Sequence, residues 1–89
     1  MFEIIEKENE NELELLIKLP VGKSQSELVK ESGEFVEKNS PKFFGKDVFL
    51  SGRVTTAMCL VLGHKLSHIT KSVSILDPKE NTFVLCIFH

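Results

Sequence analysis

Five short stretches of the chain have the apolar or alternating pattern that is typical of β-strands. These stretches are residues 2–7, 13–19, 47–50, 72–76 and 82–88. Polar residues at 8–12 separate the first two stretches, and a polar turn at 77–81 separates the last two. Such short polar connections predict two hairpins, one at each end of the chain.

Two further stretches have the spacing of apolar residues that is typical of helices. The first begins with Ser24 three residues before Glu27, a capping-box signal, and stops before Pro41. Gly33 weakens this helix by roughly 1 kcal/mol without breaking it. The second follows Val54 and is apolar on nearly every side, which predicts a helix that is buried on most of its surface.

The predicted order of elements is therefore ββαβαββ. The economical packing of this order is an α+β fold of the ferredoxin-like kind, a mixed sheet with two helices on one face. We expect one domain over residues 1–89. Because a chain of this length has a small core, we also expect a homodimer.

The net charge of −2 gives the chain no general attraction to nucleic acid, so we do not expect it to bind duplex DNA. A phosphate-bearing ligand would need a compact site. No apolar run is long enough to cross a membrane, and no secretion signal is present, so we expect a cytoplasmic protein without a membrane partner. Cys59 and Cys86 each lie in an apolar stretch, and we expect both to be buried free thiols.

The segment from Leu50 to Thr56 is the first candidate site, at the predicted junction between a strand and a helix. The start of a helix presents unpaired N–H groups and a partial positive charge, which together bind anions. Gly52 permits close approach of the backbone, Arg53 can bind a phosphate through two hydrogen bonds, and Thr55 and Thr56 add hydroxyl donors. The alternative interpretation is a plain helix cap made by Ser51 or Thr55, with Arg53 in solvent.

His64 and His68 are the second candidate, because a spacing of four residues places both imidazoles on one face of a helix. The pair could bind a metal or exchange protons. Its place at the end of the helix also favours the charged imidazolium, which alone could explain it. Asp77 is the third candidate, although Asp-Pro at a strand end is most often turn chemistry. His89 is the last residue, where fraying is the simpler expectation.

The motifs Ser51-Gly52-Arg53, His64-Lys65, His68 and Val73-Ser74-Ile75-Leu76-Asp77-Pro78 resemble those of a known family. The chain is similar to the small ring nucleases of type III CRISPR systems, the third of the CRISPR-associated Csx families. In that family an SGR turn follows a strand, a helix ends in a histidine-rich stretch, and an Asp-Pro closes the next strand. The resemblance covers about 28 residues and agrees with the predicted order of elements.

Membership would imply a ferredoxin-like fold, a dimer, and cleavage of cyclic tetra-adenylate, the second messenger of type III CRISPR defence. The ligand is held between dimers in this family, so a larger assembly could form on binding. Manganese is the cofactor that the resemblance suggests, because related members are described as manganese-dependent RNA deadenylases. Ser51 and Arg53 would contact phosphate, Asp77 would be the catalytic carboxylate, and a histidine near the helix end would be its partner. His89 falls near another family histidine.

Two positions depart from the family pattern. Ser67 occupies the place of the catalytic histidine, with His68 one residue later, and Lys79 stands where the family often has an arginine after Asp-Pro. Ser67 keeps open a second class of function, a non-catalytic sensor of cyclic oligoadenylate or a small oligomeric interaction module. A metal-dependent exonuclease acting on RNA tails is a third possibility.

Overall fold

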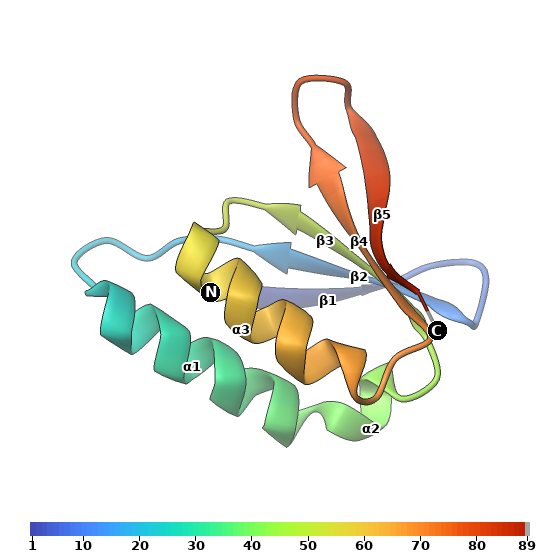
Figure 1. The fold of residues 1–89 in the computed structure, drawn as a ribbon, viewed down its shortest axis with the longest axis horizontal. Coiled ribbons are helices and arrows are strands. Elements are labelled where there is room, and N and C mark those ends of the chain that lie inside the picture. The colour runs from blue at the N-terminus through green and yellow to red at the C-terminus, as the bar shows by residue number, and fades with distance from the viewer. Residues whose placement is uncertain (89) are drawn as a thin grey trace.

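The computed structural model describes residues 1–88 and contains eight elements (Figure 1). The five strands are β1 (Phe2–Glu6), β2 (Glu12–Ile17), β3 (Asp47–Gly52), β4 (Ser72–Asp77) and β5 (Thr82–Phe88). The three helices are α1 (Gln25–Lys38), α2 (Ser40–Phe43) and α3 (Thr56–Ser67). The predicted order ββαβαββ is confirmed, with the short helix α2 added between α1 and β3.

The strands form one mixed sheet in the order β1-β2-β3-β4-β5. β1 pairs antiparallel with β2, and β4 pairs antiparallel with β5, so both predicted hairpins are confirmed. β2, β3 and β4 are parallel to one another, joined through α1 and then α3. Right-handed crossovers that step in one direction across a sheet put their helices on the same face, and Figure 1 shows both helices there. The α+β class is confirmed, although the strand order is not the classical ferredoxin one.

The core lies between the helices and one face of the sheet. Alternate residues of β2 and β3 point toward the helices and are buried, as are the inward residues of α3. They are Leu13, Leu15, Ile17, Val48, Leu50, Met58, Leu62 and Leu66. The opposite face of the sheet is not covered by any element of residues 1–88, so β2 and β3 alternate between buried and partly exposed positions over most of their length.

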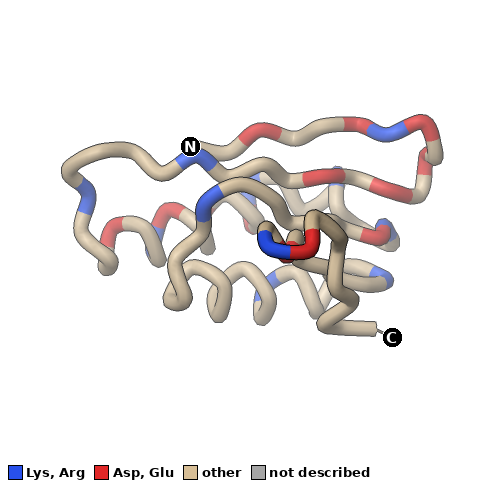
Figure 2. Tube along the Cα trace, turned by 90° about the horizontal axis from the view of Figure 1, so that it is seen from above, with Lys and Arg blue, Asp and Glu red and all other residues tan. Residues whose placement is uncertain are grey.

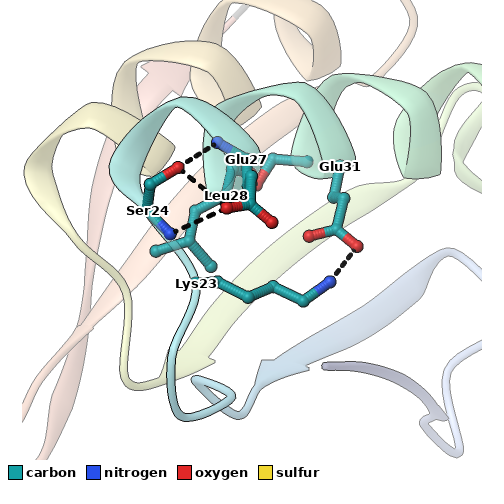
Figure 3. A network of polar contacts seen from close by, with 6 residues as sticks. Lys23, Ser24, Glu27, Leu28 and Glu31 are labelled. Carbon is teal, nitrogen blue, oxygen red and sulfur yellow. Dashed lines mark hydrogen bonds and ion pairs between the residues drawn. The ribbon is translucent and has the colours of Figure 1, made fainter.

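Helix α1 begins as the sequence predicts. The Ser24 Oγ accepts a hydrogen bond from the Glu27 N–H at 3.2 Å, and the Ser24 N–H donates to Glu27 Oε1 at 3.3 Å (Figure 3). Lys23 forms an ion pair with Glu31 in the next turn. The reciprocal bonds satisfy two N–H groups that the start of a helix otherwise leaves without partners.

The residues around Phe43 and the end of β3 differ in detail from the predicted elements. The sequence pattern did not predict α2, whose last residue, Phe43, has its side chain fully buried in the core. Pro41 favours a helix here because it stands in the first turn, where its missing N–H costs nothing. The strand predicted at 47–50 is longer than expected, because Ser51 and Gly52 extend β3 by pairing with Leu16 and Ile17 of β2.

Burial was overestimated for α3 and for both cysteines. Leu60 on α3 is 73% exposed, and Cys59 is only partly buried. Cys86 is exposed, because β5 has a neighbouring strand on one side only. Both thiols are free, as expected. Among residues 1–88, no helix combines the length and the apolar character that a bilayer-spanning segment requires.

Candidate functional site

A cavity of about 360 Å³ opens where β3 and β4 end and α3 begins. Leu50, Ile75 and Leu76 form apolar parts of its wall, and Arg53 and Thr56 are polar residues that line it. The carboxyl ends of neighbouring parallel strands are where open sheets with helical crossovers commonly bind ligands. All residues of the first candidate segment except Thr55 therefore line one cavity: Leu50, Ser51, Gly52, Arg53, Val54 and Thr56.

Gly52 fixes the path of the chain into this cavity. Its φ of +86° suits glycine, and a β-carbon there would lie 2.2 Å from the carbonyl oxygen of Ile17. The next N–H, that of Arg53, donates to the same oxygen at 2.9 Å. Gly52 is thus required for contact with β2 within the fold, and this requirement is independent of any ligand.

The start of α3 is capped by Thr55. Its hydroxyl accepts a hydrogen bond from the Met58 N–H at 3.2 Å, so the alternative interpretation of Thr55 as a helix cap is correct. The first turn of α3 carries no acidic residue that would neutralise the partial positive charge of the helix start. Thr56, the first helical residue, lines the cavity. This end of α3 therefore remains favourable to an anion.

Arg53 and Ser51 differ in how their side chains are used. The Arg53 guanidinium is exposed and has no hydrogen bond or ion pair with any other residue of the range 1–88, so it is free to bind a ligand. The Ser51 hydroxyl is buried and donates to Glu14 Oε2 at 2.6 Å, across to β2. Glu14 also lies 3.5 Å from the Lys7 ammonium. The Ser51 side chain thus has a structural partner, and the alternative that it caps α3 is wrong.

Asp77 is the last residue of β4, and Lys79 lies in the turn between β4 and β5. Asp77 Oδ1 accepts a hydrogen bond from the Lys79 N–H at 3.0 Å, which is the turn chemistry that Asp-Pro favours. The residues on either side of Asp77, Leu76 and Pro78, line the cavity. Asp77 is therefore at the same end of the sheet as Arg53.

The two histidines lie at the other end of α3. Their ring centroids are 4.8 Å apart with the planes at 87°, which confirms that they share a face of the helix. His64 is eight residues beyond Thr56, or about 12 Å along the axis at 1.5 Å per residue. Among the described residues, no group of three His, Cys, Asp or Glu side chains is arranged to hold a metal ion. Within one protomer, the structure does not bring the histidines to the cavity with Arg53, and His89 lies outside the described residues.

Cys59 is a wall residue that the sequence-based candidates omitted. Partial burial, and secondly the nearby Cys86, raise the pKa of its thiol. Leu19 and Pro78 were not proposed as site residues either. Both follow the end of a parallel strand, and that placement is the signal that could have identified them.

Comparisons with known proteins do not assign the chain to a family. No protein-family model matches it, and no curated protein does either. The resemblance to ring nucleases therefore rests on the motifs between Ser51 and Pro78.

Proposed function

We propose that this protein is a CRISPR-associated ring nuclease that binds and cleaves cyclic oligoadenylate, with cyclic tetra-adenylate as the first candidate. Cleavage of this messenger would switch off type III CRISPR signalling. The observation that carries the proposal is the cavity at the ends of β3 and β4, where the unpartnered Arg53 side chain and the start of α3 meet. The motif resemblance suggests the ligand class, and the cavity supports the proposal of a binding site.

The cavity suits one nucleotide unit of such a ring. The Arg53 guanidinium can hold a phosphate through two hydrogen bonds, and the positive end of α3 adds to this attraction. Leu50, Ile75 and Leu76 offer an apolar wall for a base. A volume of about 360 Å³ is near the lower limit of the roughly 300–1,000 Å³ usual for small-molecule sites. The rest of a four-nucleotide ring would therefore lie outside this cavity, against a second protomer.

Cleavage requires three actions on one phosphodiester: removal of the 2′-hydroxyl proton, stabilisation of the added phosphate charge, and protonation of the leaving oxygen. Arg53 would supply the second action. Asp77, at the same end of the sheet, would orient a histidine or bind a divalent ion such as manganese. Because His64 and His68 are at the opposite end of α3, the proton-transfer histidine would come from another protomer that shares the ring. A shared site agrees with the arrangement that the family resemblance implies.

Incubation of the purified protein with labelled cyclic tetra-adenylate, with and without manganese, tests the proposal. Linear products resolved by chromatography would establish the enzyme. We expect Asp77→Ala and His68→Ala to abolish turnover, and Arg53→Ala to weaken binding. Lys42→Ala is the matched control, because it also removes one exposed cation but lies on α2, away from the cavity. Turnover that survives both Asp77→Ala and His68→Ala would contradict the mechanism.

A non-catalytic sensor of cyclic oligoadenylate is the second candidate function. Ser67 at the family's histidine position favours it, as does the separation of His64 and His68 from Arg53 within one protomer. A sensor would retain the intact ring in complex with the protein, and Arg53→Ala would release it. An intact ring that never binds would leave only an interaction module of the same fold.

A further inference from the structure

The face of the sheet opposite the helices changes from acidic on β2 to apolar on β5. Two rows of residues that pair across β2, β3, β4 and β5 share this gradient. They are Glu14, Phe49, Ser74 and Leu85, and Glu12, Asp47, Ser72 and Phe88. Leu85 and Phe88 share this face although they are three positions apart, because a β-bulge places one extra residue on β5 between them. We call the surface formed by these two rows the open face.

The distribution of charge in the chain has the same direction. The β1–β2 hairpin, residues 2–17, carries six glutamates and one lysine, whereas β5 carries no charged residue. Figure 2 shows red segments along the first two strands and a tan strand that ends at the C label. A surface of this polarity repels phosphate groups, so it disfavours nucleic acid as a ligand. It is complementary to a partner that carries cations beside an apolar stripe.

The open face already binds one cation of the chain itself. The Lys7 ammonium lies 5.3 Å from the ring centroid of Phe49 and 5.7 Å from that of Phe83. The two ring centroids are 5.0 Å apart, and Glu14 Oε1 lies 3.5 Å from the same ammonium. Aromatic rings together with a carboxylate are the components of a site for a cationic side chain. A lysine or arginine of a partner would find the same components if Lys7 moved aside.

The strands of the open face indicate which kind of element would cover it. β2, β3 and β4 are parallel, and parallel strands are ordinarily covered by helices on both faces of the sheet. Here α1 and α3 both lie on one face (Figure 1). On the uncovered face, Leu85 is 57% exposed and Phe88 is 67% exposed. A helix with an apolar stripe is therefore the element that fits this face.

We infer that the open face binds a basic amphipathic helix of another protein. The apolar side chains of that helix would pack on Leu85 and Phe88, and its lysine or arginine side chains would lie toward β2. One of these cations would replace Lys7 at the two aromatic rings and the Glu14 carboxylate. Lys7 would thus compete with the partner for a site within its own chain.

Fluorescence anisotropy with a labelled peptide tests the inference. The probe contains the heptad Leu-Lys-Lys-Leu-Leu-Lys-Leu twice, and a second peptide has glutamate in place of each lysine. We expect saturable binding of the lysine peptide alone, weakened about tenfold by Leu85→Ser, which removes an exposed leucine from the interface. Leu60→Ser is the matched control, because Leu60 is 73% exposed but lies on α3, on the other side of the sheet, so binding should not change. Absence of binding, or equal affinities in the two variants, would overturn the inference.

Lys7→Ala tests the cation site separately from the apolar contacts. Removal of Lys7 empties the site, so we expect it to strengthen binding of the lysine peptide more than Lys18→Ala does. Lys18→Ala is the matched control, because it removes a lysine that pairs with Glu3 at 3.5 Å, beside the same hairpin. A gain in Lys7→Ala no larger than that in Lys18→Ala would contradict the cation site. Self-association of the free chain that Leu85→Ser abolishes would show that a second copy covers the open face, and it would overturn the inference as well.

Discussion

Gly52 of β3 passes so close to Ile17 of β2 that a β-carbon on Gly52 would lie 2.2 Å from the Ile17 carbonyl oxygen. The same oxygen accepts the hydrogen bond of the Arg53 N–H at 2.9 Å. These two contacts hold the backbone of Gly52 and Arg53 against the neighbouring strand β2. The chain therefore leaves the sheet at Arg53 in a fixed direction, toward the start of α3.

We expect Gly52→Ala to destabilise the protein by more than about 3 kcal/mol, because the substitution combines an unfavourable φ with a backbone collision. Gly22→Ala separates these two causes. Gly22 has nearly the same φ, +85° against +86°, but no atom lies within 4 Å of where its β-carbon would be. Gly22→Ala should therefore lower the free energy of unfolding by about 1–2 kcal/mol, the cost of the backbone conformation alone. Urea unfolding of both variants measures the difference, and equal losses would contradict the steric argument.

The capping box of α1 gives a second prediction. Ser24→Ala removes the hydroxyl that accepts the Glu27 N–H, so it should lower the free energy of unfolding by about 1 kcal/mol. Ser26→Ala is a matched control, because Ser26 is an exposed serine of the first turn that makes no capping bond. Urea unfolding should place the control within about 0.5 kcal/mol of wild type. If Ser26→Ala lowered the free energy of unfolding as much as Ser24→Ala does, the capping bond would not be the cause of the destabilisation.

Gly33 offers a stabilising substitution. It lies inside α1, where glycine is about 1 kcal/mol less favourable than alanine. A β-carbon at this position would meet Val61 Cγ1 and Lys65 Cε of α3 at 3.6 Å, which is an ordinary van der Waals contact. We therefore expect Gly33→Ala to raise the unfolding free energy by about 0.5–1 kcal/mol. A decrease would mean that α1 and α3 cannot accommodate one added methyl group.

The sequence was sufficient to predict the order of elements, because each element has a local signal: alternation in β2, a capping box at Ser24, and polar turns in both hairpins. The helix α2 escaped prediction because its four residues have no period, and what holds it is the burial of Phe43, a long-range contact. The exposure of Leu60 and Cys86 also depends on tertiary structure. Local patterns report that these residues are apolar, but only the sheet order leaves β5 at an edge.

The candidate site, like the fold, could be predicted from the sequence only in part. Arg53 and Thr56 were identified from a strand-to-helix junction, and the structure places both in the wall of one cavity. The distance of His64 and His68 from that cavity follows from helical rise, so the sequence already contained it. The partnership of Ser51 with Glu14 did not follow from the sequence, because these residues are 37 positions apart and meet only through the register of β2 and β3.

Cys59 gives a prediction about pH. Because partial burial raises the pKa of its thiol, the native chain retains this proton to higher pH than the unfolded chain does. The resulting contribution to stability is fully present below the thiol pKa of the unfolded chain, and it is lost as the pH rises through the native value. Thiolate is the reactive form, so alkylation of Cys59 in the native protein should have its pH midpoint above that of the same residue in urea.

Mass spectrometry after iodoacetamide treatment over a series of pH values measures both midpoints, and Cys86→Ser separates the two causes. Burial is the larger cause and the nearby Cys86 the smaller, so removal of Cys86 should lower the native midpoint only part of the way. A native midpoint equal to the unfolded one in Cys86→Ser would identify the neighbouring thiol, rather than burial beside the cavity, as the cause. Because Cys59 lines the cavity with Arg53, a bound nucleotide should also slow its alkylation, and Arg53→Ala should remove that protection.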